Sequence, residues 1–309
     1  MRIIGKTHFD FVGKKKISFA ISAVIAVIGL LAIVQIARNA ANMGIDFTGG
    51  TSVQLKFSQP VPMEAARDAL VRHNMKEASL QEIKDGNRLL IKVGKSRLAA
   101  GNVADTIKGV FTKEFPANDF TVESSIEIGP AIGDKLKKDT LIAVALSMIG
   151  IIVYIAWRFD FKFGVGATVA TLHDVLAMFA VFHLMGKEIN LLFITAVLTI
   201  AGYSLTDTVV VFDRIRENMR KNLTMSLPEV FNISINEVLS RSIITSLTTL
   251  LAASSLYLFG GKVIHDFALA LVVGIVVGVY SSIFIASPLV LGWEAGPRKS
   301  STERGIESP

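Results

Sequence analysis

The sequence contains no cysteine among its 309 residues, so it has no disulfide bond, no thiolate metal ligand and no cysteine nucleophile. Charged residues are also scarce, because they make up 19% of the chain, fewer than in ordinary soluble domains. A glycine-rich phosphate loop is missing as well, since Gly49 and Gly50 precede a predicted strand and do not open a helix. These absences exclude thiol chemistry and leave no indication of an ATP site.

Hydrophobic residues, in contrast, make up 51% of the chain, which has a mean hydropathy of +0.52. They gather in six runs that are long enough, or nearly so, to cross a bilayer as helices of about 20 residues. The runs are predicted at 17–37, 140–157, 164–185, 189–212, 242–260 and 267–291. The first run exceeds the roughly 7 to 15 apolar residues of a cleaved signal peptide, so we interpret it as an uncleaved anchor.

Basic residues predict the orientation of these runs, because lysine and arginine in short loops stay on the cytoplasmic side. They lie before the first run, between the second and third, after the fourth and after the sixth, whereas the alternate loops hold only Lys187 and Lys262. Both termini are therefore expected in the cytoplasm. The net charge of +6 follows this topology and forms no groove-sized patch, which argues against nucleic-acid binding.

The runs and their orientation divide the chain into five predicted parts. A cytoplasmic segment at 1–16 precedes the first transmembrane helix at 17–37. The only long loop, 38–139, is exported and is polar enough to fold in water. Transmembrane helices two to six fall within 140–291, and a cytoplasmic tail occupies 292–309.

Alternating and helical patterns predict the fold of the exported loop. Val53, Leu55 and Phe57 alternate with polar residues, as in a strand with one buried face, and a second such pattern at 89–93 follows the turn dipeptide Asp85-Gly86. Helical spacings occur at 63–70, between these two patterns, and at 102–115, after them. The last strand, near 120–128, is expected to place Val122, Ile126 and Ile128 on one face.

The predicted order of strand, helix, strand, strand, helix and strand is the ferredoxin-like pattern. The fold class predicted for the whole chain is therefore a polytopic α-helical membrane protein with six transmembrane helices and one exported α+β ferredoxin-like domain between spans one and two. This domain carries no catalytic constellation. Its lone histidine, His73, lacks a second ligand at metal-binding spacing, so we predict neither a metal site nor a cofactor.

An aspartate, Asp207, lies inside the otherwise apolar run 189–212, which ends at the charged cluster beginning with Asp213. At about 1.5 Å per helical residue, this carboxylate is roughly 9 Å inside the charged boundary. One interpretation is that the helix ends early and Asp207 lies among the lipid headgroups. The other is a proton or ion relay, since a short acidic side chain cannot easily reach the surface from there.

Other polar residues also fall inside the predicted spans. His173 and Asp174 lie near the middle of the third, where a charge must be neutralised, paired or beside water. A structural hydrogen bond between helices and a relay role both fit them. Arg241 begins the fifth span, where a basic residue commonly snorkels to the boundary. Ser204 and Thr206 belong to a hydroxylated stretch that helix packing and a wet path explain equally well.

Three motifs give the chain a resemblance to a known family. They are GIDFTGGT at Gly44–Thr51, IGPAIG at Ile128–Gly133 and GYSLTDTVVVFDRIRE at Gly202–Glu217. In this order, and with one domain after the first span, they resemble the SecF family of bacterial protein-export membrane subunits. The motif residues that we single out are Asp46, Gly49, Gly50, Gly129, Pro130, Gly133, Asp213 and Arg214.

The resemblance implies half of a transporter of the resistance-nodulation-division superfamily, and not an enzyme. Its partners would be SecD, the SecYEG translocon, an exported unfolded polypeptide and the lipid bilayer of the inner membrane. It also implies that Asp207 and Arg241 take part in proton passage with an acid from SecD, which couples the proton motive force to protein translocation. His173, Asp174, Ser204 and Thr206 would support them within the membrane.

Two other functions fit the same residues. One is half of a small-molecule or ion exporter of the same superfamily, although complete pumps generally carry twelve spans and two exported domains in one chain. The other is a non-transporting scaffold for a membrane partner, in which the buried charges serve only assembly.

Overall fold

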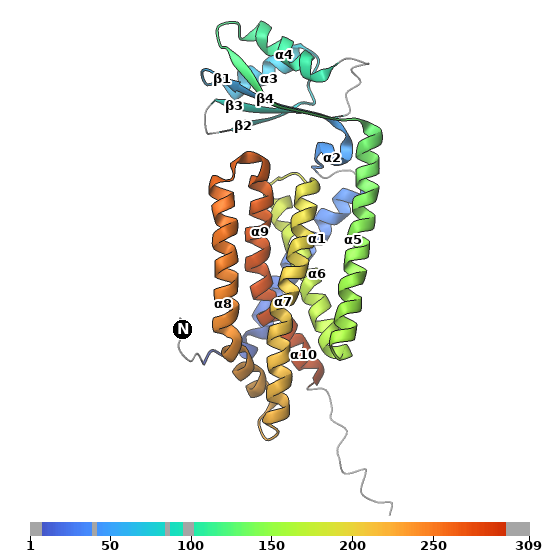
Figure 1. Ribbon diagram of the computed structural model, residues 1–309, viewed down its shortest axis with the longest axis vertical. Helices are drawn as coiled ribbons and strands as arrows, with labels where there is room; N and C mark the ends of the chain where they lie inside the picture. Colours follow the sequence, from blue (N-terminus) through green and yellow to red (C-terminus); the bar gives the residue numbers. More distant parts are fainter. Residues whose placement is uncertain (1–7, 39–41, 84–86, 95–101, 295–309) are drawn as a thin grey trace, which may run out of the picture. The chain divides into compact units, whose positions relative to one another are not determined.

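The computed structural model of the chain describes residues 8–38, 42–83, 87–94 and 102–294. They belong to two units, shown in Figure 1. The helical unit combines Met1–Ala40, Leu146–Lys187 and Thr195–Pro309, and the domain unit combines Ala41–Ala145 and Glu188–Ile194. Two long helices, α5 (Pro130–Arg158) and α7 (Leu191–Lys221), begin in the domain unit and continue into the helical unit.

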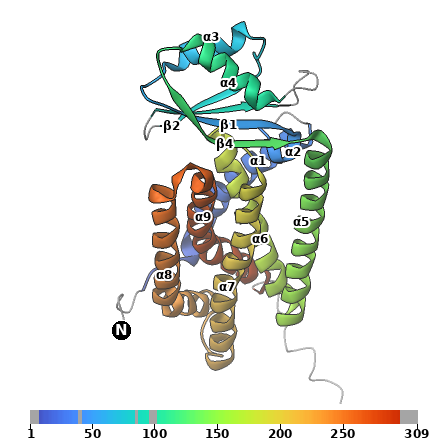
Figure 2. The ribbon, with the colours of Figure 1, turned by 45° about the horizontal axis from the view of Figure 1, so that its top comes forward.

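A four-stranded antiparallel sheet with strand order β2-β3-β1-β4 forms the domain unit, and helices α3 and α4 cover one face (Figure 2). The chain enters through the short helix α2. This arrangement confirms the ferredoxin-like prediction. In chain order the elements are α2 (Ile45–Thr48), β1 (Gly50–Phe57), α3 (Met63–Arg72), β2 (Ser79–Ile83), β3 (Arg88–Val93), α4 (Val103–Glu114) and β4 (Phe120–Ile128).

The core of the domain unit lies between the sheet and its two helices. The apolar positions of the alternating patterns in β1 and β3 are buried, and so is the inner face of α4. Asn102 caps α4, because its side-chain oxygen accepts hydrogen bonds from the first N–H groups of the helix. The predicted Asp85-Gly86 turn lies outside the described residues. The largest fully buried side chains of this core are Leu55, Leu70, Ile91, Ile107 and Phe111.

Val122 does not share a face of β4 with Ile126 and Ile128, as the sequence predicted, because the strand contains a bulge. β4 pairs with β1, and the register shifts so that Leu55 faces Val122 whereas Ser52 faces Ile126. The extra residue, Glu123, reverses the alternation, and Ile126 is 52% exposed. Glu123 accepts hydrogen bonds from Arg88 on β3, which holds the pKa of its carboxyl below the ordinary value.

Six helices of the described chain are long and apolar enough to cross a membrane. Within the helical unit α1 packs on α6, α6 packs on α9, and α9 packs on α8. The core includes the large side chains Phe212, Ile215 and Phe231. The elements not yet introduced are α1 (Lys15–Ala37), α6 (Phe161–Leu184), α8 (Leu227–Phe259), α9 (Gly261–Ser281), a π-helix at Ser282–Ala286 and α10 (Ser287–Glu294).

The helices on either side of the loop after run four extend well beyond the apolar runs. α7 continues past residue 212 to Lys221, and α8 begins at Leu227, before the apolar run that starts at 242. A capping box starts α8, in which Ser226 and Glu229 satisfy each other's backbone N–H groups. The amphipathic first turns of α8 pack apolar side chains into the helical core, so hydropathy alone does not find them.

The amino-terminal segment Phe9–Gly13 is bound to α8 through two asparagines one turn apart. Asn236 accepts a hydrogen bond from the Phe9 N–H at 3.0 Å and donates one to the Phe9 carbonyl at 2.9 Å. Asn232 accepts from two further backbone N–H groups of the segment. Asp10 accepts from a backbone N–H within the segment and from Asn232, and these bonds lower the pKa of its carboxyl.

Two glycines of α9 lie where α7 approaches closely. A Cβ atom on Gly274 would lie 2.5 Å from the side chain of Ile200, and one on Gly278 would lie 3.0 Å from that of Ser204. The first distance is too short for a Cβ atom without a shift of its neighbour and the second is tight, so the GxxxG spacing marks a close helix contact here. That contact brings the hydroxyl groups of the two helices together.

Candidate functional site

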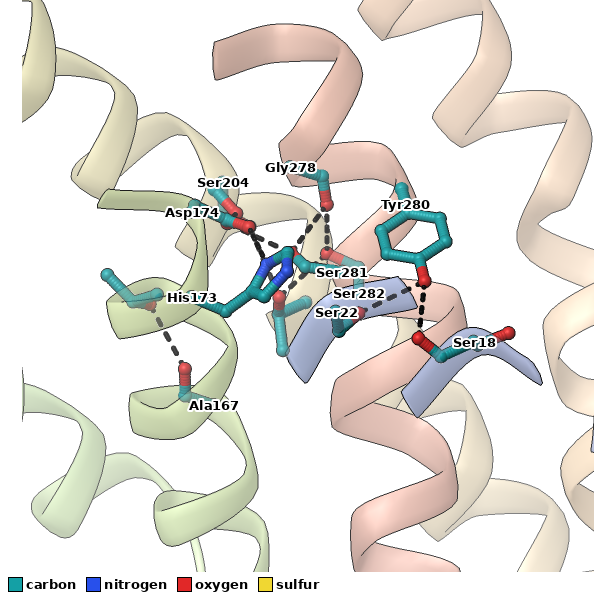
Figure 3. A network of polar contacts seen from close by, with 12 residues as sticks. Ser18, Ser22, Ala167, His173, Asp174, Ser204, Gly278, Tyr280, Ser281 and Ser282 are labelled. Atoms are coloured by element: carbon teal, nitrogen blue, oxygen red, sulfur yellow. Dashed lines mark hydrogen bonds and ion pairs between the residues drawn. The ribbon is translucent and has the colours of Figure 1, made fainter. Parts of the chain in front are cut away.

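Asp174 lies at the centre of a buried polar network in the helical unit (Figure 3). Its side chain projects from α6 and has no exposed surface. The Oδ2 atom accepts hydrogen bonds from the hydroxyl of Ser204 on α7 at 2.5 Å and from that of Ser281 on α9 at 2.9 Å. One carboxyl group therefore joins three membrane helices.

The neighbouring His173 extends this network. Its Nδ1 atom lies 3.3 Å from Asp174 Oδ1, and its ring, only 6% exposed, lies 6.1 Å from the ring of Tyr280 on α9. The Nε2 atom has no hydrogen-bond partner among the described residues. Tyr280 donates to the backbone carbonyl of Ser18 on α1 at 2.9 Å, and its hydroxyl lies 3.0 Å from that of Ser22. Four helices thus contribute to one polar region.

One turn after Ser204, a second hydroxyl contact joins α7 to the π-helix. The hydroxyls of Thr208 and Ser282 lie 2.8 Å apart, and one donates to the other. The hydroxyl that accepts can donate in turn to a backbone carbonyl one turn earlier, which is that of Ser204 for Thr208 and that of Gly278 for Ser282. π-Helical turns are rare and occur frequently at functional sites. Here the irregular turn follows directly after Ser281, one of the two hydroxyl donors to Asp174.

Asp207 lies three residues after Ser204 on α7 and contacts α8. Its Oδ1 atom accepts a hydrogen bond of 2.5 Å from the buried hydroxyl of Ser242, whereas Oδ2 has no partner among the described residues. Arg241, the residue before Ser242, is exposed and attracts the carboxylate electrostatically. The described chain contains no ion pair between Asp207 and Arg241 within 4.0 Å. A serine, and not the arginine, is therefore the direct partner of the acid.

The two predicted supporting residues of α7 differ in placement. Ser204 is buried and bonds to Asp174, as described above. Thr206 is exposed, and its hydroxyl donates to the carbonyl of Gly202 one turn earlier in the same helix. Thr206 therefore joins neither acid in the part of the chain that the structure describes.

The charged end of the span-four motif holds helix ends together. Arg158 at the end of α5 donates to Asp213 on α7 at 2.5 Å. Arg214 donates to Glu217 of its own helix and to Glu237 on α8, each at 2.6 Å. Asp213 and Arg214 thus connect α5, α7 and α8 outside the apolar part of the spans.

The other two family motifs meet in the domain unit. Gly49 and Gly50 have φ angles of +68° and +142°, which glycine adopts far more readily than other residues. A Cβ atom on Gly50 would lie 2.4 Å from the carbonyl oxygen of Val93, and one on Gly133 would lie 2.8 Å from the nitrogen of Gly49. Pro130 starts α5, as expected for a residue without an N–H group. These glycines allow α2, β1 and the start of α5 to meet at backbone distance.

Asp46, in the same motif, binds the start of α7. Its Oδ2 atom accepts a hydrogen bond of 2.9 Å from the N–H of Leu191, the first residue of that helix. The preceding Ile189 forms a parallel bridge with Met43, in which the Gly44 N–H donates to the Ile189 carbonyl at 2.9 Å. The domain unit therefore binds the loop from which α7 begins.

A part-buried ion pair strengthens this attachment. Lys92 on β3 donates to Glu188, which precedes the bridge and is only 8% exposed. The Nε2 atom of His73 lies 3.1 Å from a carboxyl oxygen of Glu114. The described residues contain no group of three or more potential metal ligands.

Several of these partners were missed by the sequence interpretation. Ser242 and Ser281 are the direct donors to Asp207 and Asp174, but hydropathy does not show which way a serine faces on a helix. Lys92 and Glu188 lie far apart in the sequence, and no local pattern connects them. For α8, which carries Ser242, the sequence does hold a signal: the spacing of Ser226 and Glu229 is that of a capping box and predicts where the helix starts.

Asp174→Leu is expected to lower the free energy of unfolding by about 2–5 kcal/mol, because two serine hydroxyls and the His173 ring lose their acceptor. Asp174→Asn keeps an acceptor oxygen and should lose less than half as much. Thermal unfolding of the purified protein in detergent measures both. Equal stability of Asp174→Leu and the unchanged protein would show that the network does not stabilise the helices.

A ferredoxin-like domain between the first two of six spans, together with carboxyl groups bonded to hydroxyls inside those spans, defines a polytopic membrane protein with an intramembrane polar site. Residues 107–296 match the family model described as "Protein export membrane protein SecD/SecF, C-terminal", and residues 40–61 match that of the "SecD/SecF GG Motif". The chain belongs to the SecD/SecF family of protein-export membrane proteins.

Relatives and solved structures agree with this family. The protein translocase subunit SecF of Thermodesulfovibrio yellowstonii is 52% identical over 94% of this chain and 96% of its own length. That of Calditerrivibrio nitroreducens is 41% identical over 92% of this chain and 93% of its own. The crystal structure of SecDF, a translocon-associated membrane protein from Thermus thermophilus, matches 93% of this chain with a TM-score of 0.81 and 36% identity. This chain spans 39% of that SecDF chain.

Proposed function

We propose that the chain is the SecF-like subunit of a SecD–SecF complex that uses the proton motive force to promote protein translocation with SecYEG. The observation that carries this proposal is the length over which the chain matches its relatives. The chain matches nearly the whole length of proteins named SecF but only 39% of a SecDF chain. SecD would supply the remaining part, and an exported unfolded polypeptide would be the substrate.

The proposed location is the bacterial inner membrane, with both termini in the cytoplasm and the domain at 38–139 in the periplasm. The distribution of basic residues supports this orientation. The order of elements is compatible with it, because α5 and α7 both begin in the domain unit and both end in the helical unit.

Asp207 is the proposed site of protonation, and Arg241 is the cation that responds to it. Asp207 has one carboxyl oxygen bonded to Ser242 and one without a described partner, at which a proton can bind. Protonation removes the negative charge and weakens the attraction to Arg241, and release of the proton restores it. The contact between α7 and α8 would then alternate between two arrangements.

The membrane potential supplies enough free energy for such a change. One proton that crosses the full potential supplies about 2.3 kcal/mol per 100 mV, so one or a few protons can bias a domain movement. The periplasmic domain would move with this cycle and help to draw the polypeptide outwards. An acid from SecD would complete the proton path.

His173, Asp174 and Ser204 are proposed to support this site by fixing α7 one turn before Asp207. The bond from Ser204 to Asp174 ties α7 to α6, and Ser281 ties the same carboxyl to α9. Among the described residues, the hydroxyl of the exposed Thr206 donates to Gly202 of its own helix and joins no other helix. Movement of α7 would therefore pivot about a fixed polar contact.

The proposal is tested with inverted membrane vesicles that contain or lack the chain, in the presence of SecD. Export of a preprotein is measured with the proton gradient intact and after its collapse, and association with SecD is measured by co-purification. We expect the chain to bind SecD and to raise export only while the gradient is present.

Two results would overturn this function. Binding to SecD with no gradient-dependent gain in export would favour a scaffold. Normal export accompanied by gradient-driven efflux of small molecules or ions would favour half of an exporter of another kind.

A further inference from the structure

The start of α7 is attached to the domain unit by three different kinds of interaction. Asp46 caps the Leu191 N–H, Met43 and Ile189 form a backbone bridge, and Lys92 pairs with the largely buried Glu188. All of these residues lie within the domain unit. The first turn of α7 is therefore part of the domain in structural terms, although the rest of the helix belongs to the helical unit.

The ion pair would be the costliest of the three to break, because the contact between Asp46 and Leu191 is exposed and water can replace it. The Leu191 N–H is one of the first N–H groups of a helix, which have no partner within the helix itself. Glu188 is only 8% exposed, and separation from Lys92 would leave a buried charge without a partner. Gly44 permits the close approach, since a Cβ atom there would lie 2.8 Å from the Cβ of Asn190.

The attached helix is the one that carries Asp207. From Leu191 to Asp207 an uninterrupted helix of 16 residue steps spans about 24 Å. It contains no proline, the usual cause of a sharp kink. A shift or rotation of α7 at the acid therefore reaches its first turn, and the three interactions pass it to the sheet.

We propose that Asp46, Lys92 and Glu188 form a coupling clamp, which transmits movement of α7 to the periplasmic domain. These are positioning residues, since they act through α7 and not on the proton. The inference rests on the proposed function and adds the connection between proton passage and domain movement. Asp46 belongs to a family motif, whereas Lys92 and Glu188 lie outside the three motifs noted in the sequence.

Charge reversal tests the ion pair. We expect Lys92→Glu and Glu188→Lys to reduce gradient-dependent export several-fold, and the double exchange to restore it, because only the double variant has opposite charges at the two positions again. Proton flux through the assembled SecD complex should be unchanged in all three. Glu123→Gln is the matched control, since it removes an ion pair with Arg88 inside the same domain but away from α7.

Outcomes of this experiment separate coupling from simple stability. A loss of export together with an equal loss of proton flux, or no rescue in the double variant, would overturn the clamp. Amide hydrogen exchange keeps the test independent of the proposed function. Asp46→Ala should accelerate exchange at Leu191 whether or not export depends on the gradient, and unchanged exchange would contradict the attachment itself.

A crosslink provides a second test, which the absence of native cysteine makes specific. Met43→Cys with Ile189→Cys places two thiols across the backbone bridge, close enough for a disulfide. A clamp that stays closed throughout the cycle predicts normal gradient-dependent export in the oxidised form. Export that stops on oxidation and returns on reduction would show that this contact has to open, which would overturn the proposal.

Discussion

Asp207→Asn is expected to reduce gradient-dependent export to the level of membranes that lack the chain. The amide has nearly the same volume and can still accept the hydrogen bond from Ser242, so the packing of α7 on α8 should remain. It cannot ionise, however, so the charge that attracts Arg241 is absent at every stage of the cycle. The measurement is preprotein export into inverted vesicles with and without the proton gradient.

The control for this experiment lies one residue away. Thr206→Val removes an exposed hydroxyl that bonds only to its own helix, and it should leave export unchanged. Membrane level and SecD association of both variants must equal those of the unchanged chain. Normal gradient-dependent export by Asp207→Asn under these conditions would reduce Asp207 to a packing residue and support the scaffold interpretation.

Gly50→Val and Gly133→Val are expected to destabilise the domain unit by about 2–4 kcal/mol each, because a branched side chain has no room at either position. At Gly50 the φ angle of +142° adds backbone strain to the clash with Val93. At Gly133 the new Cβ atom would push α5 away from Gly49. We expect thermal unfolding at a lower temperature and a several-fold lower membrane level.

Gly129→Ala is the matched control, since it lies in the same motif as Gly133. No atom lies within 4 Å of the position that its Cβ would occupy, so the variant should accumulate normally. Similar losses in all three variants would mean that the motif glycines are required for something other than close backbone contact.

Much of the fold could be predicted from the sequence because the hydrophobic pattern determines which surfaces are buried. The alternation in β1 and β3 and the helical spacing in α4 located the domain core, and six apolar runs located the spans. The expectation that Val122, Ile126 and Ile128 share one face of the last strand was wrong, since the bulge at Glu123 depends on pairing with β1 and has no local signature. The early start of α8 was missed because its first turns are amphipathic.

The candidate site was only partly predictable for a related reason. An intramembrane acid such as Asp207 or Asp174 stands out because its burial is costly, whereas a serine is inexpensive to bury and abundant in these spans. Which serine reaches each acid depends on the rotation of helices about their axes, which tertiary packing sets. The Lys92 to Glu188 contact is similarly fixed by the three-dimensional fold alone.

The contacts of the amino-terminal segment have a consequence for sequence variation. Asn232 and Asn236 bond mainly to backbone atoms of Phe9–Gly13, which every residue except proline supplies in full. Replacement of the exposed Phe9 should therefore be tolerated better than replacement of Phe11 or Val12, which are buried in the helical core. An inserted residue would shift every backbone group away from its amide partner. Selection at this end of the chain is expected to act on length and register as well as on the two buried side chains.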